Sequence, residues 1–311
     1  MPGLEPFRDE LPIPDTVHAL ERDGRRGLVI TAQVASARLH ATLPPTTTWS
    51  YRVTDGEVVR AGRGETYLGP TIEVARGETI GVTWTNGIDA DAALPFEVVR
   101  VPNADAETTI PVPQNVPGRD GALPDAQDPG RRALRDLRAA LVTHLHGGRT
   151  QSYSDGWPDD TVVSGQSLHY RYQNDQSSAM LWYHDHSMHV TRLNVYAGLA
   201  GVWLVRDDEE ARLSLPDGAY ELPLLIQDRN LDVDDGGHFT GALLHKVEAE
   251  DGPMEFFGPY TLVNGVIWPK AAVEPRLYRL RVLNAANART YRLSLLDESG
   301  RTVNDRLTLI G

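Results

Sequence analysis

Short apolar segments recur along the first two hundred residues, each bounded by turn-forming Gly, Asn or Pro. They are rich in β-branched and aromatic residues, a composition and length typical of β-strands. The segments that predict strands in this part of the chain span residues 27–33, 48–53, 71–74, 78–84, 168–172, 179–184 and the end of 194–205. The pattern therefore predicts an all-β sandwich or barrel.

The same pattern returns after residue 207, with predicted strands at 221–228, 260–263, 277–283 and 291–295. The acidic run 207–210 between the two sets is predicted to be a solvated linker. We therefore predict tandem β-sandwich domains, the first at 1–207 with an arm at 1–24, and the second at 208–311. Residues 307–311 read as the middle of a strand, so the second domain is expected to be incomplete on its C-terminal side.

Two stretches break the strand pattern. Residues 102–133 are rich in Pro, Asp, Asn and Gly and show no periodicity, which predicts a long excursion over the surface. Residues 133–140 are the one helix-like piece, and they precede the segment that carries the first pair of histidines.

Composition then narrows the function. The chain has no cysteine, which excludes disulfides, Cys-bearing zinc sites, thiol nucleophiles and thiolate blue-copper centres within it. The formal charge of −13 argues against nucleic acid or an anionic membrane as a partner. No secretory signal is recognisable at the start, and the longest apolar run, 195–205, is too short to span a bilayer. We therefore expect a soluble, cytoplasmic protein.

Two His-x-His pairs carry the candidate chemistry. His184 and His186 follow Trp182 and Tyr183 in a strand-like segment, and in a strand residues i and i+2 face the same side, roughly 6.6–6.8 Å apart. His144 and His146 repeat the spacing before Gly147 and Gly148. Four imidazoles converging from two strands predict a metal site. Neutral imidazole suits copper, zinc, iron and nickel, so the ligands alone leave the metal open.

His189 is the remaining histidine near the second pair. An odd offset from His186 along a strand would point it to the other face, so it is not expected to bind the metal.

Several motifs in this chain resemble those of the three-domain bacterial multicopper oxidases, in particular the spore-coat laccase and phenoxazinone synthase group. The motifs that carry the resemblance are THLHGG at 143–148, SDG at 154–156, WYHDHSMH at 182–189, TRLNVYAGLAG at 191–201, IQDRN at 226–230, VNGVIWP at 263–269 and RVLNAANARTYRLSL at 281–295. They cover most of residues 140–311 in the family's order, whereas the first hundred residues match more weakly.

The resemblance implies tandem cupredoxin-like Greek-key β-sandwiches that bind copper. His144 would bind the type 2 copper, and His146, His184 and His186 would bind the type 3 pair. Asp155 would stand on the proton path to the cluster, although an Asp that caps the turn before Gly156 is an equally good reading of the sequence.

The resemblance also implies parts that this sequence does not contain. The family's third domain carries the other half of these ligands and the type 1 copper with its cysteine. This chain is therefore expected to be the N-terminal part of a longer enzyme, completed by a C-terminal cupredoxin domain as a separate chain, after cleavage, or in the same gene. Homo-oligomer formation is left open.

Three functions compete at this point. The first is an oxidase that removes single electrons from small aromatic substrates, phenols or o-aminophenols, and reduces dioxygen to water. The second is a non-enzymatic copper-binding scaffold with the cupredoxin fold, which the lack of cysteine favours for the chain taken alone. The third, a zinc or iron hydrolase, lacks a carboxylate base in an HExxH-type arrangement.

Overall fold

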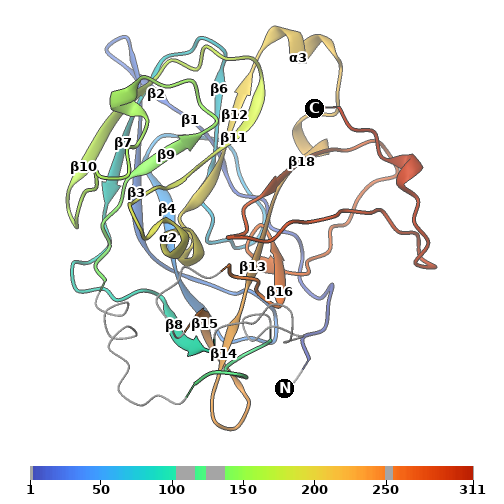
Figure 1. Cartoon of the computed structure of the whole chain (residues 1–311). Coiled ribbons are helices and arrows are strands. Elements are labelled where there is room, and N and C mark those ends of the chain that lie inside the picture. Colours follow the sequence, from blue (N-terminus) through green and yellow to red (C-terminus); the bar gives the residue numbers. More distant parts are fainter. Residues whose placement is uncertain (1–2, 103–115, 124–136, 249–254, 311) are drawn as a thin grey trace.

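Two facing sheets form the first unit of the computed structural model, which describes residues 3–102, 116–123, 137–248 and 255–310 (Figure 1). The first sheet has the strand order β5 (Glu57–Arg60), β1 (Thr16–His18), β6 (Thr71–Ala75), β12 (Ala200–Arg206), β11 (Ala179–Asp185) and β9 (Thr143–His146). The second sheet has the order β10 (Ser167–Tyr172), β7 (Ile80–Asn86), β3 (Arg25–Ala37) and β2 (Leu20–Arg22), with β4 (Thr46–Asp55) also paired to β3.

Alternating burial along the strands explains why these two sheets pack together. In β7 every second residue is buried, so Ile80, Val82 and Trp84 point into the core while Gly81, Thr83 and Thr85 alternate with them on the other side. Trp84 meets Tyr183 of the opposite sheet at a ring-centroid distance of 5.2 Å. The period-two pattern that predicted strands also selects the buried face of each sheet.

A second unit contains two smaller sheets. One has the order β17 (Val266–Ile267), β16 (Tyr260–Val263), β13 (Glu221–Arg229) and β18 (Arg279–Asn284), and the other has β14 (Leu231–Val233), β15 (Phe239–Glu248) and β8 (Phe96–Val101). Strand β8 comes from the range predicted for the first domain, yet it pairs in parallel with β15. The two sequence ranges are thus joined by a shared sheet, and the boundary at residue 207 stays a prediction.

The N-terminal arm is shorter than predicted. Residues 16–18 and 20–22 of the expected arm at 1–24 are strands β1 and β2. The residues before them lie along the second unit, where the Phe7 amide donates to the Trp268 carbonyl at 2.9 Å and the Asn264 side chain donates to the Pro12 carbonyl at 2.8 Å.

Other predicted elements differ from the structure. The buried strand at the end of 194–205 begins only at Ala200, because residues 191–197 form the short helix α2 (Thr191–Ala197). Residues 291–295 and 307–310 are not strands, and residues 137–140, the described part of the helix-like piece, are not helical. Most of the predicted excursion at 102–133 lies outside the described residues.

Large apolar side chains remain exposed on β18 and on the segment after it. Those at least 38% exposed are Leu280, Val282, Leu293, Leu295, Leu296, Leu307, Leu309 and Ile310. This segment extends away from both sandwiches in Figure 1, on the right of the view. We call these residues the C-terminal apolar face. Exposed apolar side chains in such number are typical of an interaction surface.

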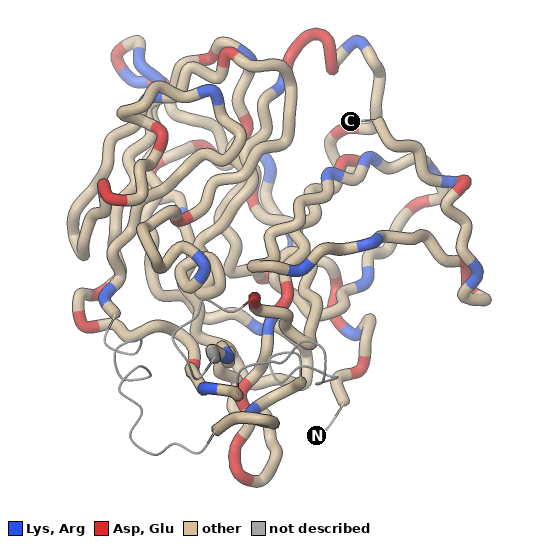
Figure 2. Tube along the Cα trace, viewed as in Figure 1, with Lys and Arg blue, Asp and Glu red and all other residues tan. Residues whose placement is uncertain are grey.

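The acidic run 207–210 is only in part the solvated linker that the sequence predicted. Asp207 caps the short helix α3 (Asp208–Arg212) by accepting the Glu210 amide at 2.8 Å. Glu210 itself is buried and pairs with Arg279 at 2.5 Å and with Arg281. Figure 2 shows acidic residues gathered at α3 and at the turn between β14 and β15.

Glu221 forms the centre of the same ion network, with Arg206 at 2.5 Å and Arg281 at 2.6 Å. Burial alone would raise the pKa of its carboxyl, but hydrogen bonds from the two guanidinium groups outweigh burial and lower the pKa to about 2. The carboxylate therefore stabilises the fold above its ordinary pKa of 4.5, and that contribution is lost as the pH falls towards 2.

We expect Glu221→Gln to lower the free energy of unfolding at pH 7 by about 3 kcal/mol, because the buried guanidinium groups lose their shared anion. Urea unfolding followed at several pH values measures this cost. The difference from the natural chain should narrow as the pH falls from 4.5 towards 2. The exposed Glu298→Gln should change stability by less than about 0.5 kcal/mol. Equal stability of both variants at pH 7 would contradict the network's role.

Candidate metal centre

Two neighbouring antiparallel strands bring the histidine pairs together. In the β9–β11 register His144 lies opposite His184, and Leu145 lies opposite Tyr183. Leu145 and Tyr183 are buried in the core of the sandwich. Because side chains alternate along a strand, the histidines beside them point to the opposite face. The sequence prediction that the pairs share one face is confirmed for these strands.

His186 stands just outside the strand on which it was predicted, because β11 ends at Asp185. Its amide still donates to the Val142 carbonyl at 2.8 Å, so the backbone pairing continues by one bond. That bond keeps the imidazole of His186 with the other three.

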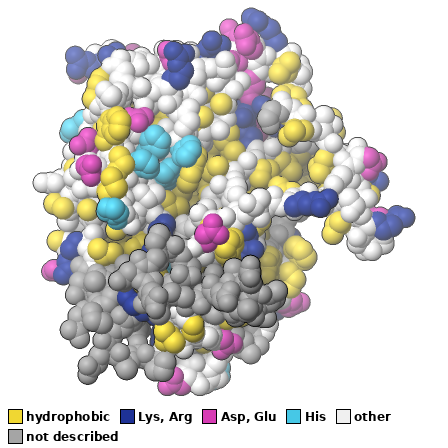
Figure 3. Space-filling model, viewed as in Figure 1, with side chains coloured by type: hydrophobic (Ala, Val, Ile, Leu, Met, Phe, Trp, Pro, Cys, Tyr) yellow, Lys and Arg dark blue, Asp and Glu magenta, His cyan; other side chains and the backbone are white. Residues whose placement is uncertain are grey.

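The four imidazoles form one cluster. Ring-centroid distances are 4.8 Å for His144–His186, 5.4 Å for His146–His184, 5.7 Å for His144–His184 and 5.8 Å for His184–His186. His184 is buried and His146 is exposed, so the cluster opens at the surface. Figure 3 shows histidine side chains gathered on one face, beside an apolar hollow.

Backbone carbonyls fix the orientation of three rings. The Nδ1 atom of His144 contacts the Asp155 carbonyl, that of His184 lies 2.7 Å from the Asp185 carbonyl, and that of His186 lies 3.2 Å from the Gly156 carbonyl. A carbonyl only accepts, so each Nδ1 carries the proton and each Nε2 keeps its lone pair. Metal-binding histidines are typically held this way, by a hydrogen bond at the nitrogen that does not bind.

The loop after β9 supplies two of these carbonyls, and its close approach explains Gly156. This glycine has a φ of +79°, and a Cβ placed on it would lie 2.3 Å from the Thr143 carbonyl oxygen. Only glycine lets the loop lie so near β9 and present its carbonyls to the rings.

Burial keeps two of the rings uncharged. It lowers the pKa of the His184 imidazole to about 3, and the neighbouring histidines contribute further. Burial and the charges of His144 and His186 also lower the pKa of His146. Both of these imidazoles are therefore uncharged near neutral pH, which is the state in which imidazole binds a metal.

Asp185 is a site residue that sequence reasoning missed. Its buried carboxylate accepts from the Val142 amide at 3.2 Å, the Ser187 amide at 3.1 Å, the Ser187 hydroxyl at 2.8 Å and the Asn194 side chain at 2.9 Å. These bonds tie the start of β9, the turn after β11 and helix α2 to one side chain. The sequence did contain a sign of this role: an acidic residue stands between two histidines that face the metal site, so its side chain must face the protein core.

Trp182 supports the rings from the side. Its indole stacks on His184 with a centroid distance of 4.0 Å and lies 5.5 Å from the ring of His146.

The structure places Asp155 beside the cluster. Its carboxylate accepts the Thr150 hydroxyl at 2.6 Å, and one oxygen lies 3.8 Å from Nδ1 of His144. His189 is exposed in a turn with a φ of +62°, so the argument from strand alternation does not apply to it. It makes no ring contact with the cluster among the described residues.

The clustered histidines can supply only some of the ligands that a metal ion needs. Within the described ranges, no three His, Asp or Glu side chains converge on a single ion. Nδ1 of His146 and Nε2 of His184 lie 3.2 Å apart. Two nitrogens bound at about 2.0–2.1 Å to one tetrahedral metal lie roughly 3.3 Å apart, so this pair has the spacing of two ligands on one ion.

Comparison with known proteins identifies the kind of centre. A family model described as multicopper oxidase matches residues 135–210, which contain all four histidines and Asp155. A laccase of Bacillus subtilis is 36% identical over 304 residues, 94% of this chain and 52% of its own length. A laccase of Haloferax volcanii is 34% identical, over 97% of this chain and 46% of its own length.

Solved structures agree with these matches. A variant of the McoA multicopper oxidase from Aquifex aeolicus superposes with a TM-score of 0.64 at 25% identity, covering 95% of this chain and 50% of that one. The predicted fold class, all-β and cupredoxin-like, is thereby confirmed. No helix in the described part of the chain has the length and apolar character needed to cross a membrane.

The relatives bear on the resemblance read from the motifs. Laccases are among them, whereas the phenoxazinone synthase half of that resemblance stays a prediction. The chain spans about half the length of the curated relatives it matches. Copper is the cofactor that this similarity implies, and the oriented imidazoles fit it. This chain is thus similar to laccases and to a multicopper oxidase over nearly its whole length, and to the multicopper oxidase family model over residues 135–210.

Proposed function

We propose that this chain supplies part of the trinuclear copper centre of a laccase-like oxidase. His144 binds the type 2 copper, and His146, His184 and His186 bind the type 3 pair. The observation that carries the proposal is the orientation of three rings by backbone carbonyls, which leaves their Nε2 atoms available in one cluster. When bound, the copper ions supply one-electron redox chemistry towards dioxygen.

The contact between His146 and His184 supports assigning these two residues to the same copper. Without metal, Nδ1 of His146 can donate its proton to Nε2 of His184, whose own Nδ1 is already bonded to the Asp185 carbonyl. If copper bound here, these two nitrogens would hold it, and His146 would carry its proton on Nε2 instead of Nδ1, so that the ring stays neutral.

The complete reaction needs donors that the described residues do not supply. The chain has no cysteine for a blue centre, and no three of its described donors enclose one ion. We propose that a further cupredoxin domain completes the cluster and packs against the C-terminal apolar face. The assembled oxidase removes single electrons from small phenols or o-aminophenols and reduces dioxygen to water.

The laccase relatives favour an oxidase over a non-enzymatic copper-binding scaffold. A hydrolase has no support among them. The scaffold reading predicts copper binding without dioxygen reduction even after a cysteine-bearing domain is supplied.

Titration of the purified 311-residue chain with copper tests the site. We expect copper to bind without an intense blue band, because the thiolate that gives that absorption is absent. Absorption and electron paramagnetic resonance spectra of the loaded chain are the measurements. An intense blue band would contradict the absence of a type 1 centre, and failure to bind copper would contradict the site itself.

A further inference from the structure

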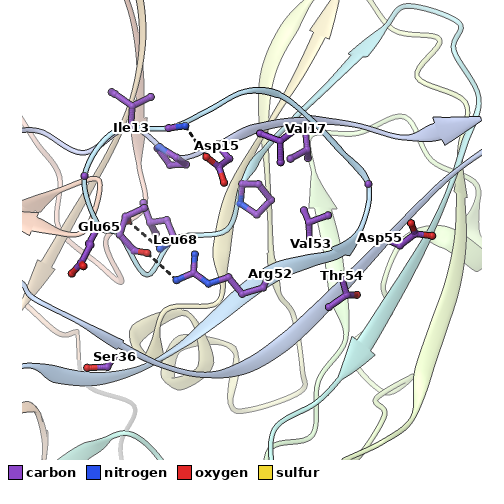
Figure 4. Close-up of a pocket in the computed structure, with 17 residues that line it drawn as sticks. Ile13, Asp15, Val17, Ser36, Arg52, Val53, Thr54, Asp55, Glu65 and Leu68 are labelled. Carbon is purple, nitrogen blue, oxygen red and sulfur yellow. Dashed lines mark hydrogen bonds between the residues drawn. The ribbon is translucent and has the colours of Figure 1, made fainter.

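A second concave site lies on the first sandwich, separate from the histidine cluster. It has a volume of about 690 Å³ and is walled by the end of the N-terminal arm, by β4 and by the loop that leads to β6 (Figure 4). None of the four clustered histidines lines it. Its volume is in the range of pockets that hold small molecules.

Arg52 extends into this cavity from β4 (Figure 4). Its Nη2 donates to the Thr66 carbonyl at 3.0 Å, and the guanidinium makes no ion pair within 4.0 Å among the described residues. Burial lowers the pKa of this guanidinium from its ordinary value. A half-buried cation without a carboxylate partner loses hydration and gains little in return, so an anion in the cavity would be bound favourably.

Asp15 lines the same cavity and carries the opposite charge. It accepts the Gly62 amide at 2.6 Å and forms no ion pair with Arg52, so the two charged groups are held more than 4.0 Å apart. Asp55, also on the lining, is already paired with Arg22 at 2.7 Å. Glu65 also lines the cavity, and its exposed carboxylate carries the same negative charge as Asp15.

Apolar side chains fill the wall around these charges. Ile13 and Val53 are half-buried and Val58 is 53% exposed, so these lining residues present aliphatic surface to the cavity. The cavity therefore offers a planar cation, a carboxylate and an aliphatic wall, a combination complementary to a molecule that carries both an acid and an amine on a small apolar body.

We propose that this cavity binds a free α-amino acid with an aliphatic side chain. The ligand carboxylate pairs with the Arg52 guanidinium, the ammonium pairs with Asp15, and the side chain lies against Val53 and Val58. Bridging by one ligand satisfies two opposite charges that the fold keeps apart. The site is independent of copper and goes beyond the oxidase function.

Three probes with the same aliphatic skeleton separate the contributions of the ligand's carboxylate and ammonium groups. L-leucine carries both charges, 4-methylpentanoate lacks the ammonium and 3-methylbutylamine lacks the carboxylate. Each is titrated into the purified 311-residue chain by calorimetry and by two-dimensional NMR. We expect L-leucine to bind saturably and each analogue to bind at least about tenfold more weakly, because each loses one charge-assisted contact.

Two variants locate the binding. Arg52→Gln and Asp15→Asn should each weaken L-leucine at least about tenfold, and the asparagine can still accept the Gly62 amide. Arg149→Gln, an exposed charge change elsewhere, should leave binding unchanged. Thermal melting checks that each variant is folded, and Arg52→Lys, which keeps the charge, replaces Arg52→Gln if that variant unfolds.

Three results would overturn the proposal. Equal affinity for L-leucine and 4-methylpentanoate would reduce the site to a carboxylate site. Binding unchanged in both folded variants would place the ligand elsewhere. No saturable binding of any probe would show that the cavity has no amino-acid ligand.

Discussion

Replacing His184 with alanine is expected to lower the copper affinity of the chain by more than about a hundredfold. Removal of a group that only orients a metal ligand typically costs 10–100-fold in affinity, and the loss of a ligand costs more. His184 is also the ring that meets His146 at 3.2 Å and stacks on Trp182, so its loss removes one of two donors to a shared ion. In the assembled oxidase, dioxygen reduction should be abolished while a blue centre carried elsewhere still accepts electrons.

Competition with a chelator of known affinity measures the copper loss, and oxygen consumption measures the reaction. His169→Ala is the matched control, because His169 is exposed and its ring contacts the Thr83 hydroxyl at 3.0 Å, away from the cluster. The same result is expected for His186→Ala in dioxygen reduction. Turnover of either variant at the natural rate would show that these histidines do not bind the type 3 pair.

The strands around the site were predictable because burial there follows a strict period of two. Leu145 and Tyr183 face the core, and the histidines beside them necessarily face the other way. The same rule still held at His186, one residue beyond the end of β11, because its backbone pairing continues, but it does not apply to His189, which lies in a turn. A pattern of alternation does not show where a strand stops.

Elements whose partners are distant in sequence were less predictable. Strand β8 was not recognised, and its neighbour β15 lies more than a hundred residues later. Residues 291–295 have the composition of a strand but do not form one in the structure, and several of their side chains are exposed. Helix α2 was hidden because all of its residues from Leu193 to Ala197 are buried, so it shows no polar face.

The orientation of the imidazole rings could not be predicted from the sequence. It depends on carbonyls from Asp155 and Gly156, whose loop must fold back on β9 before it reaches His144 and His186. Residue type says nothing about a backbone carbonyl, because every residue has one. The structure thus adds a supporting role for this loop to the side-chain role predicted for Asp155.

Asp155→Asn separates these two roles. The backbone carbonyl that holds His144 is unchanged by the substitution, and the new amide oxygen can still accept the Thr150 hydroxyl. Copper content and melting temperature should therefore stay close to those of the natural protein. If Asp155 relays protons, turnover of the assembled oxidase should fall by about a hundredfold or more, the usual range for loss of a positioned acid or base. The loss should be greatest at higher pH, where protons from solvent are scarce.

A turn-capping role for Asp155 predicts a different result. Losing a cap typically costs about 1 kcal/mol and lowers the melting temperature by a few degrees, with no change in the pH dependence of turnover. The contacts favour the relay, because the described hydrogen bond of this side chain goes to a hydroxyl, and the carboxylate lies 3.8 Å from the His144 ring and is partly exposed. Asp159→Asn, an exposed change in the same loop, should alter neither quantity. Full copper loading with an unaltered rate–pH curve in Asp155→Asn would exclude the relay. Loss of a residue that delivers protons should make turnover depend more strongly on the proton concentration of the solvent.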